Sequence, residues 1–211
     1  MNEYFDSTLL KSFATLSDIE KLCNDAKEYK FKAVCINPCY VSIAKELLKG
    51  SNVKICTVIG FPLGANTTYI KVEEARDAIK NGTDEVDMVI NIGALKDKNY
   101  DYVINEIKEL REVCYDKILK VIIETCYLTE EEIIKMTEIC NKEKVDFIKT
   151  STGFGIRGAN TRDIEIINKY KSDYLKIKAS GGIKNKDDAE KYIELGVSRI
   201  GTSNAVKIME E

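Results

Sequence analysis

Two segments of the chain each carry a lysine followed by small polar residues and glycines, a pattern that suits chemistry on a carbonyl group. They are Phe-Ile-Lys149-Thr-Ser-Thr-Gly153 and Ile-Lys178-Ala-Ser-Gly181-Gly182. Each lysine ends an apolar run and so faces the protein interior, where an ammonium group is costly unless it is paired or neutral. Two such lysines on adjacent strands repel each other, which favours loss of one proton. A neutral amine attacks carbonyl carbons, so we predict Lys149 as a covalent nucleophile.

Asp87 is the carboxylate that we expect beside these lysines. In Glu85-Val-Asp87-Met-Val-Ile-Asn91, alternation places it on the same inward face as Glu85 and Asn91. It can relay protons, or it can form a purely structural ion pair with Lys178. A structural pairing of either lysine with Asp87 or Glu124, or binding of a phosphate as a point charge, is the competing interpretation.

Three glycine-bearing loops predict a phosphate site near the lysines. Glycine permits close backbone approach, and N–H groups at helix starts hold anions. In barrels of alternating strands and helices, phosphate commonly binds after the last two strands. The three loops are Thr152-Gly153-Phe154-Gly155, Ser180-Gly181-Gly182-Ile183 and Gly201-Thr202-Ser203-Asn204.

The absence of histidine narrows the chemistry. It excludes Ser-His and Cys-His nucleophile pairs and histidine-ligated zinc. The seven cysteines form no Cys-x-x-Cys pair, so we expect reduced, mostly packed thiols, Cys35 among them.

The elements that would position these residues alternate between short apolar runs and segments of helical period, which predicts a parallel sheet with crossover helices. Capping boxes at Ser17/Glu20 and Thr129/Glu132 start two helices, and Gly82 and Gly196 end two others. The predicted strands are Tyr4–Asp6, Ala33–Ile36, Val53–Ile59, Glu85–Ile90, Leu119–Ile123, Phe147–Lys149, Leu175–Lys178 and Arg199–Ile200.

Eight such units predict one (β/α)8 barrel (TIM barrel) over residues 1–211, near the short end for this fold. An open doubly wound sheet is the rival, but its phosphate loop, Gly-x-Gly-x-x-Gly after the first strand, is missing. The net charge of −3 with no basic stripe argues against nucleic acid. No apolar run approaches the length of a membrane span and no targeting segment begins the chain, so we expect a cytoplasmic protein.

These residues resemble the deoxyribose-phosphate aldolase family almost from end to end. Eight blocks in the same order carry the resemblance: Asp6-x-Thr-Leu-Leu-Lys11, Val34-Cys-Ile-Asn-Pro-Cys-Tyr-Val41, Cys56-Thr-Val-Ile-Gly-Phe-Pro-Leu-Gly-Ala65, Glu85-Val-Asp-Met-Val-Ile-Asn-Ile-Gly-Ala-Leu-Lys96, Lys120-Val-Ile-Ile-Glu-Thr-Cys126, Lys149-Thr-Ser-Thr-Gly-Phe154, Lys178-Ala-Ser-Gly-Gly-Ile183 and Arg199-Ile-Gly-Thr-Ser203. Two features depart from the family: Ser7 replaces a frequent histidine, and Asn204 with Ala205 replaces Ser-Ser or Ser-Gly.

The resemblance implies a class I aldolase of deoxyribonucleotide catabolism that reversibly cleaves 2-deoxy-D-ribose 5-phosphate to glyceraldehyde 3-phosphate and acetaldehyde. It implies that Lys149 forms the Schiff base, that Lys178 is the cation which leaves it unprotonated, and that Asp87 and Lys178 transfer protons with a water. Asp6 would support this relay. No metal or organic cofactor is implied, and a homodimer is allowed. The implied substrate and phosphate contacts are Thr152, Gly153, Gly181, Gly182, Gly201 and Ser203.

Two other functions fit the same residues. A cofactor-free sugar-phosphate isomerase or epimerase would use Asp87 as its base and never bond to lysine. A non-catalytic barrel would bind sugar phosphates without turnover.

Overall fold

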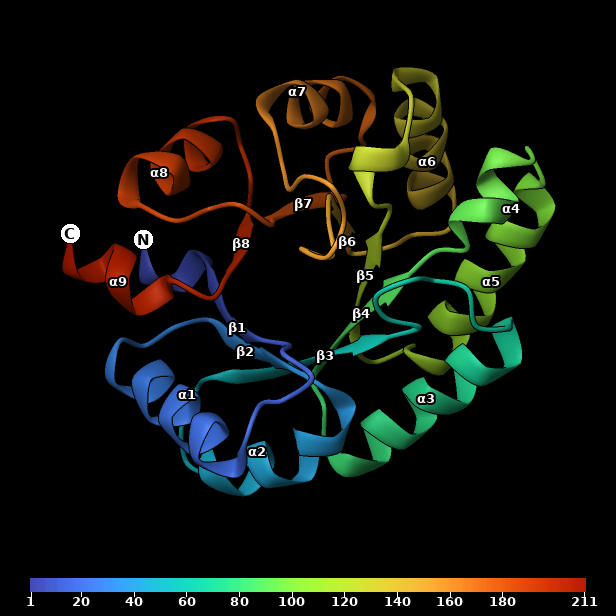
Figure 1. Ribbon diagram of the computed structural model, residues 1–211. Coiled ribbons are helices and arrows are strands. Elements are labelled where there is room, and N and C mark those ends of the chain that lie inside the picture. The colour runs from blue at the N-terminus through green and yellow to red at the C-terminus, as the bar shows by residue number, and fades with distance from the viewer.

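The computed structural model describes all 211 residues as a closed barrel of eight parallel strands, each hydrogen-bonded to the next in chain order. Helices surround the strands, and the two chain ends lie near each other beside β1 and β8 (Figure 1). The predicted (β/α)8 barrel is therefore confirmed. None of the helices combines the length and apolar character needed to cross a bilayer.

The elements follow the expected alternation. The strands are β1 (Phe5–Leu9), β2 (Ala33–Ile36), β3 (Lys54–Ile59), β4 (Glu85–Val89), β5 (Ile118–Ile122), β6 (Phe147–Lys149), β7 (Lys176–Ser180) and β8 (Arg199–Thr202). The α-helices are α1 (Leu16–Glu28), α2 (Val41–Leu47), α3 (Thr68–Asn81), α4 (Ile92–Lys96), α5 (Tyr100–Val113), α6 (Glu130–Lys142), α7 (Thr161–Tyr170), α8 (Lys186–Glu194) and α9 (Ala205–Glu210). Three 3₁₀ turns are η1 (Asn2–Tyr4), η2 (Pro38–Tyr40) and η3 (Thr125–Tyr127).

Strand β4 shows how the sequence builds the barrel wall. Successive side chains of a strand point to opposite faces. Val86 and Met88 therefore face the helices and join the main apolar core, while Glu85 and Asp87 face the interior of the barrel. A second, smaller apolar cluster fills part of that interior: Leu10, Ala33, Cys35, Cys56 and Val58.

Two strand ends differ from the prediction in a way that matters for the site. Strand β7 continues through Ser180, so Lys178 lies in mid-strand and not at its end. Strand β8 continues through Thr202, so Gly201 belongs to a strand and not to a loop. Ser180 pairs with Gly201 in the parallel ladder. Small residues do not end a strand whose backbone is still paired with a neighbouring strand.

The start of α1 also differs from the prediction. Thr15 is its N-cap and forms the capping box with Asp18, whereas the predicted box at Ser17 and Glu20 is wrong because Ser17 already lies inside the first turn. The box at Thr129 and Glu132 is confirmed. Gly82 and Gly196 adopt φ values of 108° and 85°, as predicted for left-handed helix ends.

Replacing Thr15 by alanine should lower the free energy of unfolding by about 1 kcal/mol, because the first turn of α1 loses its cap. The matched control Ser17→Ala should change it by less than about 0.5 kcal/mol. Urea denaturation of both variants measures the difference. A larger loss for Ser17→Ala than for Thr15→Ala would contradict the assignment of the cap.

Candidate active site

Seven charged side chains contact one another inside the barrel. All seven are buried, and they come from six of the eight strands. Four cations face three carboxylates, so the fully ionised cluster carries one positive charge in excess. The cations are Lys120, Lys149, Lys178 and Arg199, and the carboxylates are Asp6, Glu85 and Asp87.

Asp87 is the centre of this cluster. Its Oδ2 accepts hydrogen bonds from Lys149 Nζ at 2.8 Å and from Lys178 Nζ at 2.7 Å. Its Oδ1 accepts one from Lys120 Nζ at 2.8 Å. Burial would raise the pKa of Asp87, but Lys120, Lys149 and Lys178 outweigh burial and hold the pKa well below its usual value. The predicted meeting of Lys149 and Lys178 therefore occurs, with a carboxylate between the two amines.

A deeper group of charges supports Asp87 from below. Asp6 contacts Lys178 Nζ at 2.5 Å and accepts hydrogen bonds from the Arg199 guanidinium. Arg199 also donates to Glu85, which accepts a 2.6 Å hydrogen bond from Lys120. Despite burial, which works in the opposite direction, the pKa of Asp6 is lowered by Lys178 and Arg199.

The same ion pairs fix the protonation of Lys178. Burial lowers the pKa of this lysine, yet Asp6 and Asp87 together raise it well above its ordinary value. Lys120 behaves likewise, because Asp87 and Glu85 outweigh its burial. Both amines therefore hold their protons firmly. Lys149, in contrast, contacts only the one carboxylate that it shares with them.

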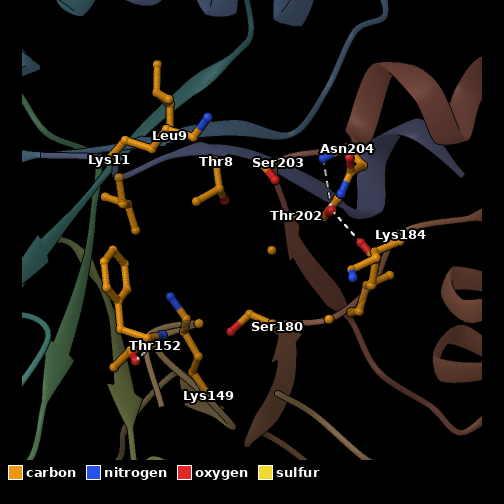
Figure 2. A pocket seen from close by; sticks show the side chains of 17 residues that line it. Thr8, Leu9, Lys11, Lys149, Thr152, Ser180, Lys184, Thr202, Ser203 and Asn204 are labelled. Carbon is orange, nitrogen blue, oxygen red and sulfur yellow. Dashed lines mark hydrogen bonds between the residues drawn. The ribbon is translucent and has the colours of Figure 1, made fainter. Parts of the chain in front are cut away.

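Lys149 is also the one cluster member that opens toward the carboxyl end of the barrel. It lines a cavity of about 290 Å³ at the carboxyl ends of the strands, where active sites of such barrels lie. Lys149 and Thr152 lie on one side of this cavity, and Lys184, Thr202 and Asn204 lie on the other (Figure 2). Asp6, Asp87 and Lys178 are buried beneath it and do not line it.

All six residues predicted to contact substrate or phosphate line this cavity: Thr152, Gly153, Gly181, Gly182, Gly201 and Ser203. Gly153 and Gly182 have positive φ, and a Cβ on either would meet nothing within 4 Å, so their backbones are open to a ligand. Gly201 has a second role, since a Cβ there would lie 3.2 Å from Lys178 Cε.

Glu124 fixes the position of Thr152. Glu124 lies in the left-handed region at φ 50°, which is uncommon for a residue with a side chain. Its carboxylate accepts hydrogen bonds from the backbone N–H and the hydroxyl of Thr152. The hydroxyl of Thr152 then accepts from Phe154 N at 3.0 Å, which shapes the loop after β6.

Two thiols lie beside the charged cluster. Cys35, Cys56 and Asp87 are close enough to share a metal ion, but Asp87 is already bound by three ammonium groups. Cys56 also donates to Asp87 Oδ1 at 3.0 Å. A hydrogen bond with Cys56 lowers the pKa of Cys35 to about 7 against the effect of burial. Cys35 is buried, in agreement with the expected packed thiol.

Comparisons with known proteins agree with this geometry. Residues 3–203 match the model of the DeoC/LacD family aldolases. The chain belongs to this aldolase family. A deoxyribose-phosphate aldolase of Treponema denticola is 52% identical over 99% of this chain and 98% of its own length.

Solved structures are similar to this aldolase over almost the whole chain. A structure described as a putative deoxyribose-phosphate aldolase of Coccidioides immitis has a TM-score of 0.96 and 40% identity, covering 99% of this chain and 84% of that one. The deoxyribose phosphate aldolase of Aeropyrum pernix, described as a unique tetramer, has a TM-score of 0.92 and 30% identity, covering 99% and 89%. As a member of the family, the protein is a carbon–carbon lyase.

Several residues of this site were not predicted from the sequence. Lys120 lies between Ile118 and Ile122 in an otherwise apolar strand, a signal that could have identified it as an interior charge. Arg199 begins β8 and gave no such signal, since an arginine at a strand start is commonly exposed. Lys11 and Lys184 line the cavity from loops whose course the sequence does not reveal.

Replacing Asp87 by asparagine should lower the free energy of unfolding at neutral pH by about 3–5 kcal/mol, because three buried ammonium groups lose a shared counter-ion. The folded pKa of Asp87 is depressed, so its contribution is present above the unfolded value of about 4 and is lost as pH falls below it. The variant should therefore lose less stability than the parent between neutral and acid pH.

Urea denaturation from about pH 7 to pH 3 measures both effects, with the exposed Asp173→Asn as control. An equal loss of stability on acidification in Asp87→Asn and the parent would show that Asp87 is not the anchoring carboxylate.

Proposed function

We propose that the protein cleaves 2-deoxy-D-ribose 5-phosphate reversibly to D-glyceraldehyde 3-phosphate and acetaldehyde through a Schiff base on Lys149. The observation that carries this proposal is that one interior lysine, bound to a single shared carboxylate, opens into a cavity lined by glycine loops. The names of the relatives, which are deoxyribose-phosphate aldolases, support the substrate.

Charge balance supports Lys149 as the nucleophile. Four cations and three carboxylates leave one uncompensated positive charge in a site shielded from water, which is unfavourable. Loss of one proton from a lysine leaves the cluster with no net charge. Lys178 and Arg199 each contact two carboxylates and Lys120 contacts three, whereas Lys149 contacts one. The proton of Lys149 is therefore the one held least firmly, and the freed amine is a nucleophile.

The reaction follows from this placement. The amine of Lys149 adds to the C1 aldehyde of the open-chain sugar and forms a carbinolamine, which loses water to give an iminium ion. The iminium accepts the electron pair of the C2–C3 bond as it breaks, the 3-hydroxyl gives its proton to water, and glyceraldehyde 3-phosphate leaves. The remaining enamine is protonated at carbon, and hydrolysis frees acetaldehyde and restores the amine.

The charged side chains beneath Lys149 are proposed to control the proton transfers of the reaction. Lys178, which Asp6 and Asp87 keep protonated, is proposed to donate a hydrogen bond to the water that protonates the enamine. Asp87 connects the two lysines by hydrogen bonds to one oxygen. Asp6 is proposed to hold Lys178 and Arg199 in place, since its depressed pKa keeps it ionised and makes it a weak proton acceptor.

The phosphate is proposed to bind at the opposite side of the cavity. Gly153, Gly181 and Gly182 offer backbone N–H groups, and Ser203 offers a hydroxyl. Gly201 completes this lining and Lys184 adds a positive charge, whereas Thr152 lies with Lys149 and is proposed to contact the sugar. The phosphate of the substrate would therefore lie across the cavity from its aldehyde, which would lie at Lys149.

The alternative isomerase is disfavoured by one observation. It requires Asp87 as a base, but three ammonium groups hold the pKa of Asp87 well below its usual value, and a carboxylate so stabilised is a poor proton acceptor. A cofactor-free reaction, a cytoplasmic location and a homodimer stay predictions. The tetramer described for the Aeropyrum pernix relative makes a larger oligomer a further candidate.

Incubation with acetaldehyde followed by borohydride should fix an ethyl group on Lys149, detectable by peptide mass spectrometry. Lys149→Leu should remain folded, lose the adduct and lose roughly a thousandfold or more of cleavage activity. The exposed Lys186 in the same sample is the control for nonspecific reductive ethylation. Turnover without an adduct would favour the isomerase, and binding without turnover would favour the silent barrel.

Removal of Lys178 should move the pH profile of residual activity toward alkali. Lys178→Leu leaves three cations facing three carboxylates, so Lys149 no longer has to lose a proton, and activity should fall roughly 100- to 10,000-fold at neutral pH. Lys120→Leu removes the same charge from deeper in the cluster and should shift the profile in the same direction. A profile unchanged in both variants would contradict the charge-balance account.

A further inference from the structure

Two of the loops that line the cavity contact each other through their backbones. The loop after β6 follows Lys149, and the loop after β7 carries Gly181 and Gly182. They meet where Gly158 lies against Gly181. A Cβ on Gly158 would lie 2.0 Å from the carbonyl oxygen of Gly181, which is too close for any real contact.

Conformation does not explain the glycine at position 158. Its φ is outside the left-handed region, unlike that of Gly181 at 80°, so no left-handed conformation requires glycine here. The nearest atoms to an added Cβ all belong to the backbone of Gly181, which cannot rotate away as a flexible side chain could. What requires glycine at 158 is therefore the approach of the two loops.

Hydrogen bonds hold the two loops in register around this contact. Ala159 N donates to Ser180 O at 3.0 Å, and Ser180 Oγ donates to Ser151 O at 2.5 Å. Ser180 N also donates to Thr150 Oγ1 at 3.3 Å. Residues 150 and 151 directly follow Lys149, so the backbone before Gly181 is tied to the segment that carries the lysine.

The loop after β6 is anchored on its other side as well. Arg157, next to Gly158, donates to Thr125 O at 3.1 Å and to Asp163 Oδ2 at 2.6 Å. This arginine fixes the segment between η3 and the start of α7. The loop therefore cannot retreat freely, and a larger residue at 158 would displace the phosphate loop instead.

We propose that Gly158 is a positioning residue that couples the phosphate subsite to the loop following Lys149. Phosphate bound at Gly181 and Gly182 holds the loop after β7 against the segment from 158 to 159. That contact in turn restricts the motion of the backbone beside the reacting amine. Binding energy from the phosphate thus serves the orientation of the aldehyde at the other end of the substrate. The inference rests on the proposed function and adds to it a residue that touches no substrate atom.

Gly158→Ala should lower kcat/KM for 2-deoxyribose 5-phosphate by ~10- to 100-fold, because the phosphate loop is displaced by a fraction of a bond length or more. It should leave kcat/KM for unphosphorylated 2-deoxyribose within about twofold and retain the acetaldehyde–borohydride adduct on Lys149. Competitive inhibition by inorganic phosphate should weaken in parallel. Gly93→Ala, where an added Cβ meets only Asn91 Oδ1 at 3.4 Å, is the matched control and should leave all three readouts unchanged.

Equal losses for the phosphorylated and unphosphorylated substrates, or no loss for either, would overturn the coupling while leaving the aldolase function intact. Failure of the parent protein to cleave either substrate or to form the adduct would instead overturn the proposed function.

Hydrogen exchange on the parent protein provides a second test that needs no variant. Inorganic phosphate should slow exchange of the Ala159 amide together with those of Gly181 and Gly182. Protection confined to the loop after β7 would overturn the proposal.

Discussion

The carboxylate of Asp87 is shared by three ammonium groups in the interior of the barrel, and the rest of the site depends on that sharing. Lys120 and Lys178 each have a second carboxylate partner, and Lys149 has none. The three lysines are thus chemically alike but differ in how firmly each proton is held. The lysine with the fewest partners is also the one at the cavity, so the arrangement that stabilises the fold leaves one amine ready for a carbonyl.

This cluster exists only in the closed barrel. Its members come from β1, β4, β5, β6, β7 and β8, and Arg199 on β8 joins Asp6 on β1 across the pairing that closes the ring. Partial structures would leave buried charges without partners, which is costly. The apolar core between the strands and the helices supplies the main driving force for folding. The charged interior therefore requires complete closure of the barrel, and closure places Lys149 at the wall of the cavity.

The sequence predicted the barrel and the residues that line the cavity because both leave local signals. Alternation in β4 gave the inward face of Asp87, and glycines beside Lys149 and Lys178 gave the loops. Contacts between distant segments left no such signal. The hydrogen bonds of Glu124 to Thr152 and the contact of Gly158 with Gly181 depend on how loops meet in space. At α1, Thr15 and Ser17 are both good caps by type, and only the course of the backbone decides between them.

The most direct test of this account is competitive acetylation of every lysine as a function of pH, followed residue by residue with mass spectrometry. An ordinary lysine reacts fully only near its pKa of about 10.4. The account predicts that Lys149 is acetylated at lower pH than the exposed Lys186, while Lys120 and Lys178, each held by at least two carboxylates, stay unreactive. If Lys149 followed the same pH dependence as the exposed Lys186, the uncompensated charge would not select its amine, and the central claim would be wrong.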